Sequence, residues 1–180
     1  MKYQSILDRI SLGQYARSEL ARLRINALEK VASGDGEAAE VIRAIDEGKP
    51  SDQYIIFMGF CPGADFANRK DKAWKEAGIC TFEFFDSTHQ LERFESIWAG
   101  DRLVLKKRHE FGKSMKLYGH GRVAGVEHDQ QGKRYLNVDW SMQERVIEVP
   151  LMGCNSTVDV KSIEQIEAEM PREFFEWLED

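Results

Sequence analysis

Basic residues gather in one short stretch of an otherwise acidic chain. The 180 residues carry a formal net charge of −6, yet residues 102–122 hold Lys and Arg at seven positions against one acid, Glu110. Such an asymmetry directs an anionic partner to one surface, although lysines on a strand also serve simply to protect a sheet edge. The basic residues expected to contact the partner are Lys106, Lys107, Arg108, Lys113, Lys116 and Arg122, from the segment that begins at Arg102.

Two glycines in the same segment flank a histidine. Gly119 and Gly121 surround His120 inside an apparent strand. Glycine in a strand marks either a bulge or bend, or a place where another molecule approaches the backbone closely. The second interpretation makes His120 a ligand contact together with its neighbours in the strand, and the first makes it part of a corner in the sheet.

Patterns for catalysis, metal binding and disulfides are missing from the sequence. It contains no nucleophile elbow, Walker loop, HExxH or zinc-deaminase pattern. The three cysteines (Cys61, Cys80 and Cys154) are scattered without a CxxC pair, and the four histidines form no metal-ligand spacing. We therefore predict no catalytic residue, no metal and no cofactor. The loop Cys154–Thr157, with His120 and Glu127, yields a nucleophile and base only if residues are chosen freely.

Helices are expected at both ends of the chain. Apolar residues spaced by three and four predict helices near residues 20–31 and 38–45, joined by a turn at 33–36 and ended by Gly48 and Pro50. This hairpin either packs on the rest of the chain or pairs with another subunit or protein. Near the C-terminus, Ser162 and Gln165 have capping-box spacing, Val160 joins the apolar face of the helix, and Pro171 begins a final helix.

The middle of the chain is predicted to be rich in strands. A buried strand at 54–60, a helix at 66–77, a strand at 79–85 and a helix at 87–97 precede strands at 103–105, 115–127, 134–140 and 145–150. Four short, closely spaced strands predict a small antiparallel β-barrel. We expect an α+β protein with an N-terminal helical hairpin (residues 1–50) and a barrel domain with C-terminal helices (residues 51–180), which also fit one compact unit.

The sequence gives no sign of membrane insertion. No apolar run approaches the roughly 18 residues that cross a bilayer, and the amphipathic start MKYQSILDRI is unlike a signal peptide. We expect a cytoplasmic protein without membrane contact.

One run of residues resembles a known superfamily. Trp98-Ala-Gly100-Asp101 leads into the apolar strand Leu103–Leu105, and the glycine-bearing strand Tyr118–Val126 follows. This arrangement resembles the PUA-like superfamily, particularly EVE and YTH domains and the DNA-reading domains of McrB-type restriction systems. The strand ending Val138-Asp139-Trp140 is similar to one in some restriction-associated domains. The resemblance covers about residues 54–150 and leaves both helical ends outside.

The resemblance implies recognition of DNA or RNA through a single-stranded or flipped-out nucleotide, often with a modified base, in a defence-associated or nucleic-acid-processing setting. Such a base is held by aromatic stacking and by hydrogen bonds to its edge. The expected pocket residues are Trp74, Trp98, Asp65 and Asn68, with Tyr118 and His120 beside them and Phe111 and Trp140 as further aromatic candidates. Each aromatic residue equally suits the core, Trp140 above all because it alternates in phase with Leu136 and Val138.

Two other functions stay open at this point. Some PUA-like relatives of the ASCH type are small hydrolases that use Lys, Thr and Glu, and a hydrolase acting on a nucleoside-type substrate is one alternative. A protein-interaction module, working through the N-terminal hairpin or the aromatic C-terminal helix, is the other.

Overall fold

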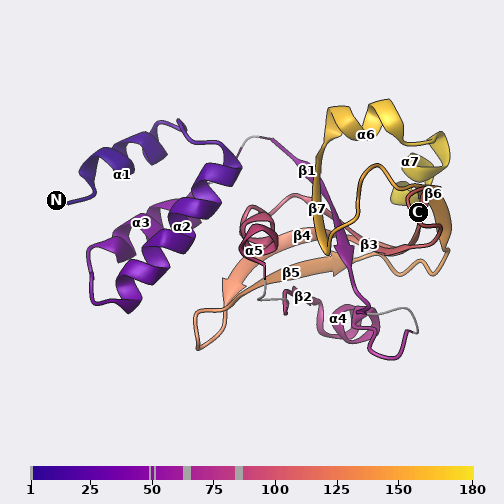
Figure 1. Ribbon diagram of the computed structural model, residues 1–180, viewed down its shortest axis with the longest axis horizontal. Coiled ribbons are helices and arrows are strands. Elements are labelled where there is room, and N and C mark those ends of the chain that lie inside the picture. The colour runs from indigo at the N-terminus through magenta and orange to yellow at the C-terminus, as the bar shows by residue number, and fades with distance from the viewer. Residues whose placement is uncertain (1, 49, 51, 63–65, 84–86) are drawn as a thin grey trace. The chain divides into compact units, whose positions relative to one another are not determined.

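The computed structural model describes residues 2–48, 50, 52–62, 66–83 and 87–180 (Figure 1). The chain divides into two compact units, one formed by residues 1–52 and 86–96 and the other by residues 53–85 and 97–180. No helix in the described part of the chain is long and apolar enough to cross a membrane.

The first unit is helical. Its helices are α1 (Gln4–Ser11), α2 (Arg17–Ala32), α3 (Ala38–Glu47) and α5 (Thr88–Glu95). The predicted pair α2 and α3 is confirmed, and α5, which the sequence division assigns to the second domain, groups with them. A buried arginine explains this grouping, because the Arg24 guanidinium lies 2.8 Å from a carboxylate oxygen of Asp46 on α3 and 3.0 Å from one of Glu95 on α5.

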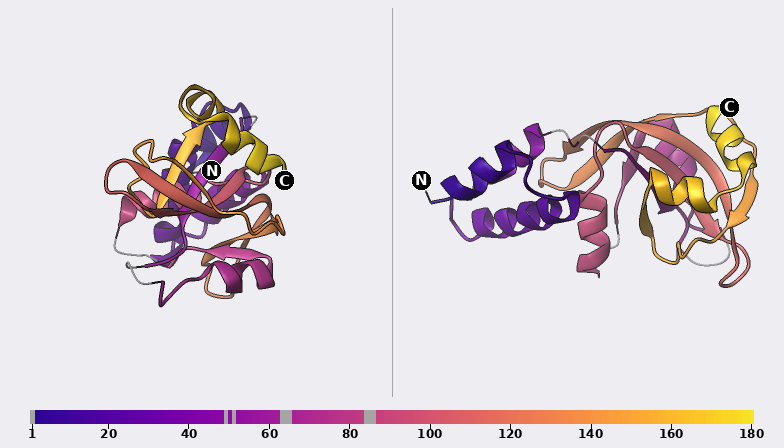
Figure 2. Two further views of the ribbon diagram at one scale, coloured as in Figure 1. Left: turned by 90° about the vertical axis from the view of Figure 1, so that its right-hand side faces the viewer. Right: turned by 90° about the horizontal axis from the view of Figure 1, so that it is seen from above.

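The second unit is built on a seven-stranded mixed sheet. Its strand order is β2-β5-β4-β3-β1-β7, with β6 paired to β4. Helices α6 and α7 lie on one side of this sheet and α4 on the other (Figures 1 and 2). The elements are β1 (Tyr54–Gly59), α4 (Asp71–Ala77), β2 (Ile79–Thr81), β3 (Arg102–Arg108), β4 (Ser114–His128), β5 (Arg134–Trp140), β6 (Ile147–Pro150), β7 (Val158–Ser162), α6 (Ile163–Glu169) and α7 (Arg172–Glu179).

The α+β class is confirmed, but the small closed barrel is not found. The described strands form an open sheet, and β1 runs parallel to β3, so the sheet is not purely antiparallel. An additional strand accounts for part of the difference. Residues 158–162 pair antiparallel with β1 along their whole length, although the sequence pattern assigned Val160 to the face of a helix. The helix begins only after the Ser162 cap, which forms the expected capping box with Gln165.

The basic segment at residues 102–122 forms a hairpin of the predicted strands, β3 and β4, with a bulge in the middle. Leu105 pairs with Gly119 and Lys106 with Leu117, so Tyr118 is the extra residue on β4. A bulge shifts the side-chain alternation of the strand by one residue. Leu117 packs in the core beside Trp177, and His120, three residues later, also contacts Trp177. The bulge therefore keeps both residues on the side of the sheet that α7 covers.

The glycine–aspartate turn before β3 has a structural role, because it connects the starts of two strands. Gly100 has φ +99°, a conformation that side chains disfavour, and it lets the chain turn into β3. The fully buried Asp101 carboxylate accepts hydrogen bonds from the backbone N–H of Tyr54 at 3.0 Å and of Trp98 at 2.9 Å. This one side chain thus ties together the starts of β1 and β3.

Candidate ligand pocket

A pocket opens at the edge of the sheet where β1 and β3 end. Its volume is about 720 Å³, within the range of ligand sites in proteins. Three segments form its wall: the residues that follow β1, the last residues of β3, and the loop between β6 and β7. The lining residues are Gly59, Cys61, Pro62, Phe66, Lys106, Lys107, Arg108, His109, Asn155, Ser156 and Thr157.

An aromatic cluster backs this pocket. The ring centroids of Phe60 and Tyr118 are 5.1 Å apart, and those of Phe66 and Tyr118 are 5.6 Å apart, both in edge-on geometry. Phe60 is buried, whereas Phe66 and Tyr118 are half-buried, and Phe66 lines the pocket itself. An aromatic surface is therefore available at the pocket wall. Burial raises the pKa of the Tyr118 hydroxyl, so this ring is neutral at physiological pH.

Two cations lie over these rings. The Lys107 ammonium is 4.3 Å from the centroid of Phe66, and the Arg69 guanidinium is 5.4 Å from the same centroid. Cations are attracted to aromatic faces at these distances. Arg69 is held by a carboxylate, since its Nε and Nη2 donate to the two oxygens of Asp71 at 2.8 and 2.6 Å. The pocket wall thus combines ring surface with positive charge.

The backbone of Phe66 adopts an unusual conformation. Its φ is +59°, in the left-handed region that bulky residues avoid. A residue held there costs about 1–3 kcal/mol and persists only where its surroundings fix it, which happens often at ligand sites. Here the rings of Phe60 and Tyr118 and the Lys107 ammonium supply those surroundings.

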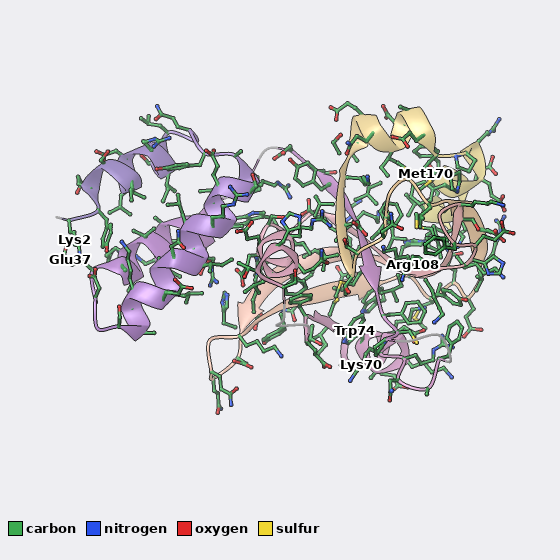
Figure 3. The ribbon with its side chains drawn as sticks, viewed as in Figure 1. Lys2, Glu37, Lys70, Trp74, Arg108 and Met170 are labelled. Atoms are coloured by element: carbon green, nitrogen blue, oxygen red, sulfur yellow. The ribbon has the colours of Figure 1, made fainter. Side chains whose placement is uncertain are left out.

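Positive charge dominates the β3 side of the pocket. Arg108, which is labelled in Figure 3, lies at the end of β3 and is exposed. Among the described residues it makes no ion pair. Lys107 is half-buried beside it, and its ammonium lies 3.9 Å from the Cys61 sulfur. His109 follows, with Nε2 3.7 Å from a carboxylate oxygen of Glu148. The expectation that these residues form a basic surface is consistent with this arrangement.

Lys106, in contrast, is a structural residue. It is buried, and its Nζ donates to the carbonyl oxygens of Cys154 at 2.5 Å and Ser156 at 2.7 Å and to the Asp159 carboxylate at 2.7 Å. An ammonium has three N–H donors, so all are used. Burial lowers the pKa of Lys106, and the Asp159 carboxylate opposes that shift. Lys106 therefore shapes the β6–β7 loop that forms the pocket wall, and its expected contact with nucleic acid is not supported.

His120 is not at the pocket either. It is buried, with its ring edge-on to Trp177 at a centroid distance of 4.7 Å. Its Nε2 lies 3.1 Å from the Trp177 carbonyl oxygen and 2.7 Å from the Gln143 amide nitrogen. Burial and the neighbouring Arg102 lower the pKa of His120 to about 4, so the ring is neutral. His120 packs α7 against the sheet. The structure therefore gives it a structural role in place of the expected ligand contact.

The strand glycines are explained by packing within the chain. A Cβ at Gly121 would lie 2.6 Å from Val138 Cγ1 and 2.7 Å from the Asp139 carbonyl oxygen, both on the paired strand β5. A Cβ at Gly119 would lie 2.6 Å from the Lys75 ammonium, which donates to the Tyr118 carbonyl oxygen. Neighbours within the chain thus occupy the space beside both glycines, without a ligand.

The two tryptophans expected in the base pocket belong to the core. Trp74 is 5% exposed, and its Nε1 donates to Thr81 Oγ1 at 3.1 Å. Trp98 is 8% exposed and lies beside the buried Arg134. Neither offers a face for stacking, because its helix or turn directs the ring inward. Trp140 is half-buried rather than fully in the core, and its Nε1 donates to the Trp74 carbonyl oxygen.

The remaining predicted residues are dispersed. Phe111 and Lys113 are exposed at the tip of the β3–β4 hairpin, and Lys116 is half-buried on β4. Arg122 is exposed at the far end of β3 from Arg108, where its Nη1 donates to the Gly100 carbonyl oxygen at 3.2 Å. Asn68 is exposed after Phe66, and Asp65 lies outside the described residues.

Several pocket residues were not among the predicted site residues. Phe66 and Cys61 lie close in sequence to the expected pocket residues Asp65 and Asn68 but were not themselves predicted. The pocket residues at 155–157 come from a distant part of the sequence, and no local signal distinguishes them. In the described part of the chain, no three His, Cys, Asp or Glu side chains are placed to hold a metal ion.

Comparison with known proteins adds no assignment. No family model, no curated protein and no solved structure matches this chain. The resemblance to PUA-like domains stays a prediction from short motifs.

Proposed function

We propose that the second unit binds DNA or RNA by taking one nucleotide into the pocket at the ends of β1 and β3. The observation that carries the proposal is the juxtaposition of the half-buried Phe66 ring with the Lys107 and Arg108 cations at one pocket wall. A nucleotide offers the complementary pair of groups, a flat base with a π-face and a phosphate.

Each part of the nucleotide meets a different part of the pocket. The base stacks on Phe66, a contact worth about 1–3 kcal/mol per base, while Lys107 and Arg108 meet the phosphates on either side. The loop residues Asn155, Ser156 and Thr157 line the same pocket and carry amide and hydroxyl groups of the kind that hydrogen-bond a base edge. Preference for a particular or modified base would arise at this loop.

The hydrolase alternative is less well supported. A Lys-dependent reaction needs an amine that is available to the substrate, whereas the three N–H donors of Lys106 are all occupied by chain atoms. The contacts of Lys106 instead fit a rigid wall for a binding pocket. We therefore propose binding without catalysis.

Fluorescence anisotropy with labelled single-stranded and duplex oligonucleotides tests the proposal. Arg108→Gln removes one phosphate contact, so it should weaken binding for every sequence and reduce the salt dependence by about one unit of slope in the plot of log affinity against log salt. Arg172→Gln is the matched control, because Arg172 is an exposed cation on α7 of the same unit, 2.9 Å from Glu176. Equal losses in both variants, or no binding at about 50 mM salt, would refute the proposal.

A second variant isolates the base. Phe66→Leu keeps an apolar side chain at the same backbone position but removes the stacking face. We expect a loss of about 5- to 150-fold in affinity, which corresponds to one stacked base, with an unchanged salt slope. Unchanged affinity in Phe66→Leu would show that no base enters this pocket.

A further inference from the structure

A second cavity, of about 230 Å³, lies at the other end of β3 and has a different chemical character. It is bounded by the starts of β1 and β3 and by helices α6 and α7. Two arginines, one acid and an apolar wall define it: Arg102, Arg122, Glu167, Ile163, Phe175 and Leu178. It shares no lining residue with the nucleotide pocket.

The arginines oppose one another directly. Arg102 on β3 pairs with Arg122 on β4 in the antiparallel register. Like charges in this position destabilise a sheet, and a counter-charge between them relieves the repulsion. Burial lowers the pKa of Arg102, and the charge of Arg122 lowers it further, so this pair is already strained electrostatically.

In the described part of the chain, no carboxylate forms an ion pair with either arginine, and Glu167 is the one acid among the residues that line the cavity. Arg102 Nη1 donates to the Leu178 carbonyl oxygen at 3.3 Å and lies 3.5 Å from His120 Nδ1, and Arg122 donates to the Gly100 carbonyl oxygen. Among the described residues, neither guanidinium has a carboxylate oxygen within 4.0 Å. Since each guanidinium has five N–H donors, most of them are available to an anion.

The other walls select what kind of anion fits. Ile163 is 38% exposed and Leu178 and Phe175 are half-buried, so a ligand that enters also covers apolar surface. Glu167 offsets one of the two positive charges, which leaves the cavity suited to a single negative charge. A carboxylate also matches the planar fork of a guanidinium.

From this geometry we propose that the cavity is a binding site for a monoanionic carboxylate on a short aliphatic chain. The carboxylate lies between Arg102 and Arg122, and the aliphatic part lies on Ile163, Phe175 and Leu178. Two sources present this chemistry, a free aliphatic acid and the C-terminal carboxylate of a peptide that ends in an apolar residue.

Two-dimensional NMR of the full chain, titrated with sodium butyrate at constant ionic strength, tests the site. A ligand of six heavy atoms should bind with a Kd on the order of millimolar. We expect saturable shifts at the cavity residues, weaker binding of acetate, and still weaker binding of inorganic phosphate. Shifts that do not saturate by about 50 mM, or equal shifts with phosphate, would overturn the proposal.

Variants tie the binding to the arginines. Arg122→Gln is preferred because the Arg122 side chain is exposed, so the variant should fold, as thermal unfolding will verify. We expect at least a tenfold loss of butyrate affinity in Arg122→Gln and none in Lys107→Gln, which alters the nucleotide pocket instead. An unchanged Kd in Arg122→Gln would sink the proposal without touching the proposed nucleic-acid function.

A third experiment distinguishes a free aliphatic acid from the C-terminal carboxylate of a peptide. A short peptide ending in Val-Leu with a free C-terminus is compared with its amidated form. Tighter binding than butyrate by the free peptide, lost on amidation, identifies a peptide terminus as the ligand, and binding by butyrate alone identifies a free acid. Equal binding by the free and amidated peptides would mean that the arginines do not recognise the carboxylate.

Discussion

Acidification should loosen the attachment of α7 through a single side chain, His120. This ring is 3% exposed and lies against Trp177 of α7. Burial and the Arg102 cation lower its pKa from an ordinary 6.5 to about 4, with Lys75 adding to the shift and the Trp177 carbonyl and Asp180 opposing it. The folded protein therefore holds His120 neutral at pH values where the unfolded chain protonates it.

The sign and size of the effect follow from proton linkage. Between pH 6.5 and 4 the unfolded state binds more protons than the folded state, so the free energy of unfolding falls as the pH falls through this window. Above pH 6.5 His120 is neutral in both states, so the full stability is retained there with respect to this group. Each pKa unit corresponds to 1.36 kcal/mol, so the shift of His120 amounts to about 3 kcal/mol in total. That is a large share of the roughly 5–15 kcal/mol that stabilises a typical domain.

Urea denaturation of the wild type and of His120→Gln, at pH values from 7.5 to 4, isolates this contribution. The variant cannot titrate at this position, so the difference between the two free energies of unfolding cancels the other ionisable groups. We expect that difference to shrink by about 3 kcal/mol on acidification. His109→Gln removes an imidazole from an exposed position and is the control. A difference that does not change with pH, or an NMR titration of His120 centred near 6.5, would refute the reasoning.

Three further predictions concern other parts of the chain. Arg24→Met should lower the free energy of unfolding by about 3–5 kcal/mol in urea titrations, because it removes the cation from a buried ion pair with Glu95, and a loss below 1 kcal/mol would contradict this. Gly121→Ala should cost about 1–3 kcal/mol in the same assay because the new Cβ overlaps Val138, whereas a neutral effect would mean that β4 and β5 separate easily. Alkylation of the half-buried Cys61 should slow when an oligonucleotide is bound, with the two buried cysteines as unreactive controls in mass spectrometry, and an unchanged rate would place the nucleic acid elsewhere.

Local patterns predicted much of the fold. Apolar spacing identified α2 and α3, and the Gly100–Asp101 turn before the apolar run Leu103–Leu105 identified the start of β3. Strand β7 was missed because its strand character depends on pairing with β1, about a hundred residues earlier in the chain, which no local pattern records. The expectation of a closed barrel was wrong for a related reason, since closure is decided by which distant strands meet.

For single residues of the site, too, local sequence patterns do not record contacts between distant segments. Lys107 and Arg108, which the sequence predicts as part of a basic surface, line the pocket. Lys106 looked identical to them, but its ammonium is buried in an ion pair with Asp159 on β7, which no local pattern records. Trp74 looked exposed because lysines surround it, yet the helix turns it inward. The cluster of Phe66 and Tyr118 required tertiary structure.

The bulge at Tyr118 has a consequence for how this chain tolerates insertions and deletions. Because the bulge shifts the alternation, Leu117 and His120 face α7, while Tyr118 joins the aromatic cluster at the nucleotide pocket. Loss of one residue here would exchange the two faces of the following strand, moving His120 and Arg122 away from α7. A length change at the exposed tip near Phe111 alters no register. Variation in length among natural or engineered versions should therefore accumulate at the tip and be excluded from residues 117–120.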